Sequence, residues 1–148
     1  MPVKVVKGDI FNTSIKCIGH GCNNQGVMGS GIAAVIRDKF PEAYQEYKVW
    51  CSATAEEDLL GDTLVVESNG KFIFNMVTQN FYGKDGLRYA KYDAIAECFW
   101  AANNHVLALE HGLAIPLIGA GLGGGNWNVI YEIIKSEAKD INVLIYRL

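Results

Sequence analysis

The stretch GHGCNNQGVMGSGIAAVIRDKF, residues 19–40, sets five glycines and two adjacent asparagines ahead of an apolar run typical of a helix. Glycine lets the backbone adopt positive φ and approach a ligand closely, at an entropic cost that an indifferent loop has no reason to bear. Gly29, Ser30 and Gly31 fall where the first helical turn leaves its N–H groups unpaired, a position that favours a phosphate. The stretch therefore predicts a ligand-binding loop that opens onto a helix.

A second glycine-rich segment, GAGLGGG at residues 119–125, also follows an expected strand and precedes an expected helix. Two such segments at the carboxyl ends of strands border one crevice, where open α/β sheets bind ligands. No Lys or Arg lies between Cys17 and Ile36, which favours a diphosphate held by backbone amides. The alternative, that the glycines only permit close packing of helix against strand, stays open. Neither segment matches the dinucleotide fingerprint with its acidic residue, and the P-loop pattern is missing from the sequence.

Short β-rich runs alternate with longer helical ones along the whole chain, a pattern that indicates an α/β fold with a mostly parallel sheet. The runs TLVVE and KFIFN flank SNG, a hairpin signal, so the sheet of about six strands is expected to be mixed. Pro41 separates two helices because proline suits a helix start and removes an interior hydrogen bond. The expected strands are residues 3–8, 16–20, 62–68, 71–77, 112–118 and 141–148, and the expected helices are residues 31–39, 41–51, 87–110 and 126–139.

Composition limits the possible function classes. With 148 residues and 50% hydrophobic content, the chain is expected to form one domain, residues 1–148. The first ten residues lack the apolar core of a signal peptide and no window resembles a membrane span, so we expect a cytoplasmic protein without a membrane partner. The four cysteines form no CxxC pair and have no histidine cluster beside them, which predicts free, mostly buried thiols, no metal site and no cofactor. A net charge of −3 without a basic cluster argues against long nucleic acid as a partner.

The order and spacing of four segments resemble the macro domain family, which binds ADP-ribose. These segments are KGDI at residues 7–10, HGCNNQGVMGSGIA at 20–33, IPLIGAGLGGGNW at 115–127 and VLIYRL at 143–148. The resemblance implies a three-layer α/β/α fold around a central mixed sheet. The HGCN variant of the first loop is similar to the compact branch that contains ADP-ribose-1''-phosphate phosphatases and terminal ADP-ribose glycohydrolases.

The resemblance also implies roles for individual residues. Asp9 and the amide of Ile10 would bind adenine, Tyr146 would line the adenine pocket, and Asn23 would contact the distal ribose. His20 matches the histidine proposed as catalytic in the phosphatase branch, so His20 and Asn23 are the candidate catalytic pair. Met28, Gly29, Ser30, Gly31 and Ile32 form the first diphosphate loop, Gly119, Ala120, Gly121, Leu122, Gly123 and Gly124 form the second, and Thr78 completes the ligand-binding set.

Each of these residues also has a purely structural interpretation. Asp9 suits a turn or cap after the first strand, Asn23 a turn, and Tyr146 ordinary strand packing. His20 could close a strand and hold the loop by hydrogen bonds. These alternatives stay open at the level of sequence.

The chain departs from the family pattern at two places. Gly123 stands where most members carry a covering aromatic and the glycohydrolases a catalytic aspartate. Gln79 and Asn80 follow Thr78 where the glycohydrolases use a lysine nucleophile, so a lysyl intermediate is not expected. Hydrolysis of ADP-ribose 1''-phosphate by His20 and Asn23 is therefore the first hypothesis. The alternatives are a non-catalytic reader of ADP-ribose, free or on macromolecules, and a de-ADP-ribosylating hydrolase that uses water directly.

Overall fold

Six strands form one sheet in the computed structural model, which describes residues 3–29, 31–80, 90–120 and 124–148. The strand order is β1-β6-β5-β2-β4-β3, and every neighbouring pair is parallel except β3 with β4. This arrangement confirms the predicted α/β fold with a mixed, mostly parallel sheet. The strands are β1 Val3–Lys7, β2 Cys17–Asn23, β3 Thr63–Ser68, β4 Lys71–Gln79, β5 Leu113–Ile115 and β6 Val143–Arg147.

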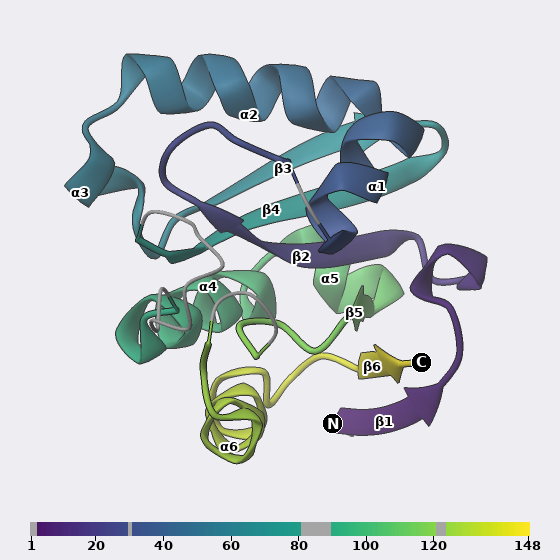
Figure 1. Ribbon diagram of the computed structural model, residues 1–148. Helices are drawn as coiled ribbons and strands as arrows, with labels where there is room; N and C mark the ends of the chain where they lie inside the picture. Colours follow the sequence, from purple (N-terminus) through teal and green to yellow (C-terminus); the bar gives the residue numbers. More distant parts are fainter. Residues whose placement is uncertain (1–2, 30, 81–89, 121–123) are drawn as a thin grey trace.

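Helices cover both faces of the sheet, which gives the three layers seen in Figure 1. Helices α1 and α2 lie on one side and pack over a core that includes Ile18, Ile36 and Ile73. Helices α4, α5 and α6 lie on the other side over a second core, which includes Phe74, Phe99 and Ile130. The helices are α1 Gly31–Lys39, α2 Pro41–Ala53, α3 Glu56–Leu59, α4 Tyr92–Asn103, α5 Val106–His111 and α6 Trp127–Glu137, with a 3-10 turn at Ile10–Asn12.

Several elements differ from those expected. The helix expected over residues 87–110 is two helices, because Asn104 ends α4 and His105 caps α5; residues 87–89 lie outside the described chain. The fifth strand stops at Ile115, and the next residue is Pro116, which has no N–H to donate to a ladder. Helix α3, one turn opened by three acidic residues, was not expected.

The second strand continues through Asn23, so the first five residues of the opening stretch belong to β2 and not to a loop. Gly19 and Gly21 are required by close packing. A Cβ atom at Gly19 would lie 3.1 Å from Met76 Sδ, and one at Gly21 would lie 2.8 Å from Thr78 Oγ1. At these two positions the glycines permit close packing between neighbouring strands, and not the packing of helix against strand that the sequence left open.

The carboxyl ends of the parallel strands β2, β4 and β5 lie along one edge of the sheet, because β2 pairs in parallel with both of the others. The two glycine-rich segments leave β2 and β5 at this edge. Within the described ranges, no helix is long and apolar enough to cross a membrane.

Candidate functional site

The first loop, residues 24–29, is organised by the side chain of Asn23 at the end of β2. Asn23 Oδ1 accepts hydrogen bonds from the N–H groups of Gln25 (2.9 Å) and Val27 (3.4 Å), and Asn23 Nδ2 donates to Val27 O at 2.8 Å. The side chain of Asn23 is only 7% exposed. Asn23 therefore performs the turn role that the sequence allowed, at the point where the loop leaves the sheet.

Tyr47 of α2 stabilises this turn through its hydroxyl group. Its hydroxyl lies 2.7 Å from Asn23 O and 2.8 Å from Asn23 Oδ1, and the side chain is fully buried. Burial raises the pKa of the Tyr47 hydroxyl, so the group keeps its proton and remains a donor. Sequence reasoning missed this residue because nothing in the spacing of α2 distinguishes it from ordinary core packing.

Asn24 connects the first loop to two other parts of the chain. Its Nδ2 lies 2.8 Å from Asn80 Oδ1 and 3.2 Å from Glu56 O, while Gln25 Nε2 donates to Asn24 Oδ1 at 2.9 Å. The side chain is 3% exposed. The loop after β2 is thus joined to the residue that follows β4 and to α3.

The amide groups expected to hold a phosphate lie between this turn and α1. Gly31 begins α1 with φ of 63°, in the left-handed region that favours glycine, and no acidic residue lies in the first turn. A helix N-terminus without an acidic neighbour is a favourable position for an anion. Gly29, Gly31 and Ile32 occupy the predicted positions around this helix start, whereas Ser30 lies outside the described residues.

The second loop leaves the sheet after β5. Gly125 N–H donates to Gly119 O at 2.7 Å, which closes the loop at its base. Gly119 and Gly124 have φ of 78° and 72°, so both need the conformational freedom of glycine. Ala120 follows Gly119 at the described end of the loop, and the predicted residues Gly121, Leu122 and Gly123 lie outside the described chain.

The predicted adenine-binding residues lie at the ends of β1 and β6, which are adjacent parallel strands. Asp9 is exposed and caps the 3-10 turn, because its Oδ1 accepts from Phe11 N at 2.9 Å. Ile10 is buried at 3% exposure. Tyr146 donates its hydroxyl to Thr13 Oγ1 at 2.9 Å and packs its ring beside Gly8. The capping and packing roles are both present, and no described residue donates to the second carboxylate oxygen of Asp9.

His20 lies inside the protein, between the sheet and α2. The side chain is 1% exposed, with Nε2 at 2.6 Å from Asn75 Oδ1, and Asn75 in turn donates to Ala43 O of α2 at 3.3 Å. Burial lowers the pKa of His20 to about 4, against the opposing effect of the Asn75 hydrogen bond, so the imidazole is neutral at pH 7. The geometry therefore gives His20 almost no surface on which a substrate could touch it.

Cys22 completes a buried Cys-His-Asn group whose residue types match those of some cysteine hydrolases. Its Sγ lies 3.5 Å from His20 Nε2. The thiol is 3% exposed, and burial raises its pKa well above the ordinary value, so it stays protonated. This group is consequently a structural polar cluster and not a nucleophilic site.

Thr78 lies at the carboxyl end of β4, on the side of the sheet that faces α4. Its residue is fully buried, and its Oγ1 has no hydrogen-bond partner among the described residues. The main-chain oxygen of Thr78 accepts from Lys91 N at 2.9 Å. An unpaired buried hydroxyl costs roughly 1–3 kcal/mol of folding free energy. Thr78 carries this cost at the same edge of the sheet as the two loops.

In the described part of the chain, no three His, Cys, Asp or Glu side chains gather closely enough to hold a metal ion. All four cysteines are free, as predicted, and Cys51 alone among them is half-buried while Cys17, Cys22 and Cys98 are buried. Burial raises the pKa of Cys17 to about 11 and of Cys98 to about 12.

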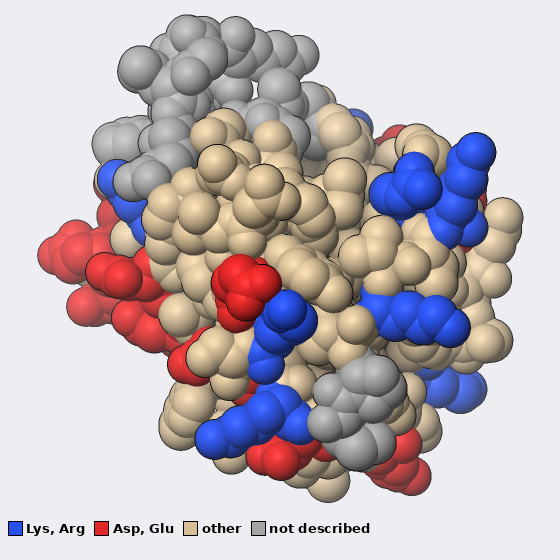
Figure 2. Space-filling view, turned by 90° about the horizontal axis from the view of Figure 1, so that it is seen from below, with Lys and Arg blue, Asp and Glu red and all other residues tan. Residues whose placement is uncertain are grey.

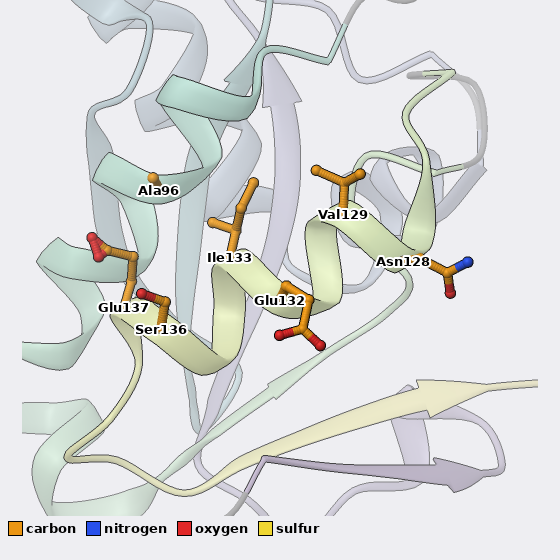
Figure 3. Close-up of a pocket in the computed structure, with 7 residues that line it drawn as sticks. All are labelled: Ala96, Asn128, Val129, Glu132, Ile133, Ser136 and Glu137. Atoms are coloured by element: carbon orange, nitrogen blue, oxygen red, sulfur yellow. The ribbon is translucent and has the colours of Figure 1, made fainter.

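A groove of about 580 Å³ lies elsewhere, between α4 and α6. Figure 3 shows Ile133 and Val129 of α6 turned toward α4, with Glu132 turned away from it. None of the predicted site residues lines this groove. It belongs to the opposite layer from α1, so we do not assign it to the crevice at the strand ends.

Charged side chains do not form one basic surface on the face seen in Figure 2. Lys and Arg occur there in separate groups with uncharged surface between them, and acidic side chains lie at the left, near the centre and along the lower edge. With a net charge of −3, backbone amides remain suitable partners for an anion at the crevice.

A family model described as Macro domain matches residues 20–134, which span β2 to α6. The chain belongs to the macro domain family. Among curated relatives, an ADP-ribose 1''-phosphate phosphatase of Scheffersomyces stipitis is 28% identical, covering 97% of this chain and 99% of that protein. The enzyme of the same name from Debaryomyces hansenii is 36% identical, covering 57% of this chain and 58% of its own length. A 17.5 kDa protein of Enterobacteria phage T4 is 31% identical, covering 98% of this macro domain and 96% of the phage protein.

Solved structures are similar over the whole chain. A Bacteroides thetaiotaomicron protein of unknown function superposes with a TM-score of 0.84 at 32% identity, covering 100% of this macro domain and 99% of that chain. Thermosipho africanus DarTG, solved in complex with ADP-ribose, superposes with a TM-score of 0.77 at 22% identity, covering 97% of this macro domain and 41% of that chain. At that identity, the second similarity establishes the shared fold alone.

Proposed function

We propose that this macro domain binds ADP-ribose along the carboxyl edge of its sheet and hydrolyses the phosphate of ADP-ribose 1''-phosphate. The observation that carries the proposal is that two glycine-rich loops leave the adjacent parallel strands β2 and β5 at one edge, with the start of α1 beside them. The names of the yeast relatives support the same activity. The proposed partners are ADP-ribose and its 1''-phosphate, and the proposed location is the cytoplasm.

The ligand would lie with adenine near Asp9 and Tyr146 and with its diphosphate over the amides of the two loops. The carboxylate of Asp9 suits the adenine end, because it would repel the diphosphate and can accept a hydrogen bond from an amine. The amides of Met28, Gly29 and Ile32 would face one phosphate and that of Gly119 the other, whereas the N–H of Ala120 donates to Leu117 O at 3.4 Å.

The reaction needs a water molecule to attack phosphorus while the bond from phosphorus to the 1'' oxygen breaks, giving ADP-ribose and inorganic phosphate. Charge develops on the phosphoryl oxygens and on the leaving oxygen, where fixed amide dipoles stabilise it. Asn23, whose side-chain atoms are engaged in the loop turn, would act at the reacting end by fixing the position of the loop. His20, neutral at pH 7 and hydrogen-bonded to Asn75, would act by holding β2 in place and not by transferring a proton itself.

Phosphate release from ADP-ribose 1''-phosphate by the purified protein tests this proposal. We expect turnover by the wild type, a strong loss of kcat in Asn23→Ala, and unchanged activity in His111→Ala, a histidine variant on α5 away from the site. Release no faster than that of a heat-denatured sample would exclude the phosphatase reaction.

A second candidate function, a reader that binds ADP-ribose without turnover, is favoured by one observation. His20 is 1% exposed, so the residue expected to transfer a proton is not accessible to a substrate. Such a reader could also take ADP-ribosylated macromolecules as partners. Calorimetric binding of ADP-ribose together with no phosphate release would support the reader over the enzyme.

A further inference from the structure

Arg37 of α1 reaches back to the loop that precedes its own helix. Its Nη1 donates to the main-chain oxygen of Met28 at 3.0 Å, and its Nε lies 3.4 Å from Asp38 Oδ1. The Arg37 side chain is 41% exposed, so it lies over the loop and is not part of the core. No Lys or Arg lies between Cys17 and Ile36, and Arg37 is the first basic residue after this segment.

The hydrogen bond from Arg37 fixes the direction of one amide. In a trans peptide the C=O and N–H groups point in opposite directions, so a carbonyl held by Arg37 turns the N–H of Gly29 away from Arg37. The Met28 side chain is 2% exposed and packs in the α1/α2 core, which fixes the Cα atom at one end of this peptide. Rotation of the peptide plane is the freedom that remains, and the Arg37 contact selects one orientation.

The preceding peptide is held in the same manner. Asn23 Nδ2 donates to Val27 O at 2.8 Å, so the N–H of Met28 points away from Asn23. Two consecutive carbonyls are therefore occupied by side chains of the protein. Among the described residues, the N–H groups of Met28 and Gly29 have no acceptor.

We propose that Arg37 is a positioning residue: by holding the Met28 carbonyl it aims the Gly29 N–H at the diphosphate of the ligand, without itself contacting the phosphate. An amide whose orientation is fixed before the ligand arrives costs less to order on binding. This inference rests on the proposed ADP-ribose site. It assigns to Arg37 the role of orienting the first diphosphate loop of that site.

The test compares Arg37→Met, which keeps the aliphatic stem and removes the donor, with Lys39→Met, which makes the same charge change two residues away on α1. We expect Arg37→Met to weaken ADP-ribose binding about tenfold. Lys39→Met should bind as the wild type does. Adenosine, which lacks the diphosphate, should bind all three proteins equally, and the deficit of Arg37→Met should persist at high salt, where a direct charge contact would be screened.

Amide NMR of the ligand-free proteins provides a measurement independent of affinity. The Gly29 N–H resonance should move in Arg37→Met and stay in place in Lys39→Met. An unmoved Gly29 resonance, equal weakening by both variants, or a deficit that vanishes at high salt would overturn the positioning role. A wild type that binds no ADP-ribose would instead refute the proposed function, while the resonance would still report whether Arg37 orients the peptide.

Discussion

At the level of single residues, the two faces of β2 differ in the space that they leave for a side chain. On the face toward α4 to α6, side chains of the neighbouring strands leave space only for glycine. On the face toward α2, there is space for the side chains of His20 and Cys22. Gly19 is surrounded by the larger number of close neighbours, because Met76, Ile115 and Leu113 atoms all lie within 3.3 Å of where a Cβ would lie. Its role is to let three core side chains meet the strand.

Replacing Gly19 by alanine is therefore expected to destabilise the fold by about 1–3 kcal/mol, the usual cost of overpacking a core. Gly29→Ala is the matched control, because its Cβ would meet only Val27 at an ordinary 3.5 Å. Urea denaturation followed by circular dichroism measures both. Equal stability of the two variants would mean that the side chains around Gly19 can move aside without an energetic cost and would contradict this prediction.

The hydroxyl of Tyr47 is the second residue whose loss should be measurable. Tyr47→Phe keeps the buried ring and removes the donor to Asn23, so we expect a loss of roughly 1–2 kcal/mol in the free energy of unfolding and weaker binding of ADP-ribose. Tyr44→Phe, on the same helix and only partly buried, should leave both quantities unchanged. A Tyr47→Phe protein with native stability and native affinity would show that Asn23 holds its turn unaided.

At the scale of elements, the sequence predicted what local signals specify. Helix α1 was predicted to its observed bounds because Gly31 and Pro41 mark its limits. Strand β2 was predicted to end three residues too early, because Gly21 and the asparagine at its end resemble loop residues when the neighbouring strand is unknown. The contact from Asn24 to Asn80 joins residues 56 positions apart, and no local pattern encodes it. The site was thus predictable as two loops, and its internal hydrogen bonds were not.

The break between α4 and α5 depends on His105. Its Nδ1 accepts from Leu107 N at 3.1 Å as an N-cap, and its ring meets Phe74 edge-on at 5.0 Å. Because an N-cap is worth about 1 kcal/mol, His105→Ala should destabilise the fold by at least that amount. His105→Asn should recover part of the loss, since asparagine caps well but lacks the ring. Thermal unfolding of the three proteins distinguishes a cap from mere packing, which asparagine could not rescue.

At the scale of the whole molecule, β2 is the central strand of the proposed site, and its stability is coupled to pH through His20. The pKa of His20 is about 4 in the folded protein against 6.5 for the ordinary group, so between these values the unfolded chain binds more protons. Stability from this group is complete above pH 6.5 and falls as the pH drops toward 4. The shift corresponds to roughly 3 kcal/mol. Glu42, whose pKa is lowered by its hydrogen bond with Ser68, adds a loss of the same sign in more acidic solution.

A variant without a titratable group at position 20 separates the contribution of His20 to the pH dependence of stability. His20→Gln should be less stable than the wild type at pH 7.5, because the Asn75 contact is disturbed, yet its free energy of unfolding should fall less steeply between pH 6.5 and 4.5. His111→Gln, a change on α5 outside this network, should keep the wild-type slope. Urea titrations across this range give the slopes directly. Parallel curves for wild type and His20→Gln would mean that the buried imidazole accepts a proton in the folded state as easily as in water, which a cluster enclosed by β2, β4 and α2 should prevent.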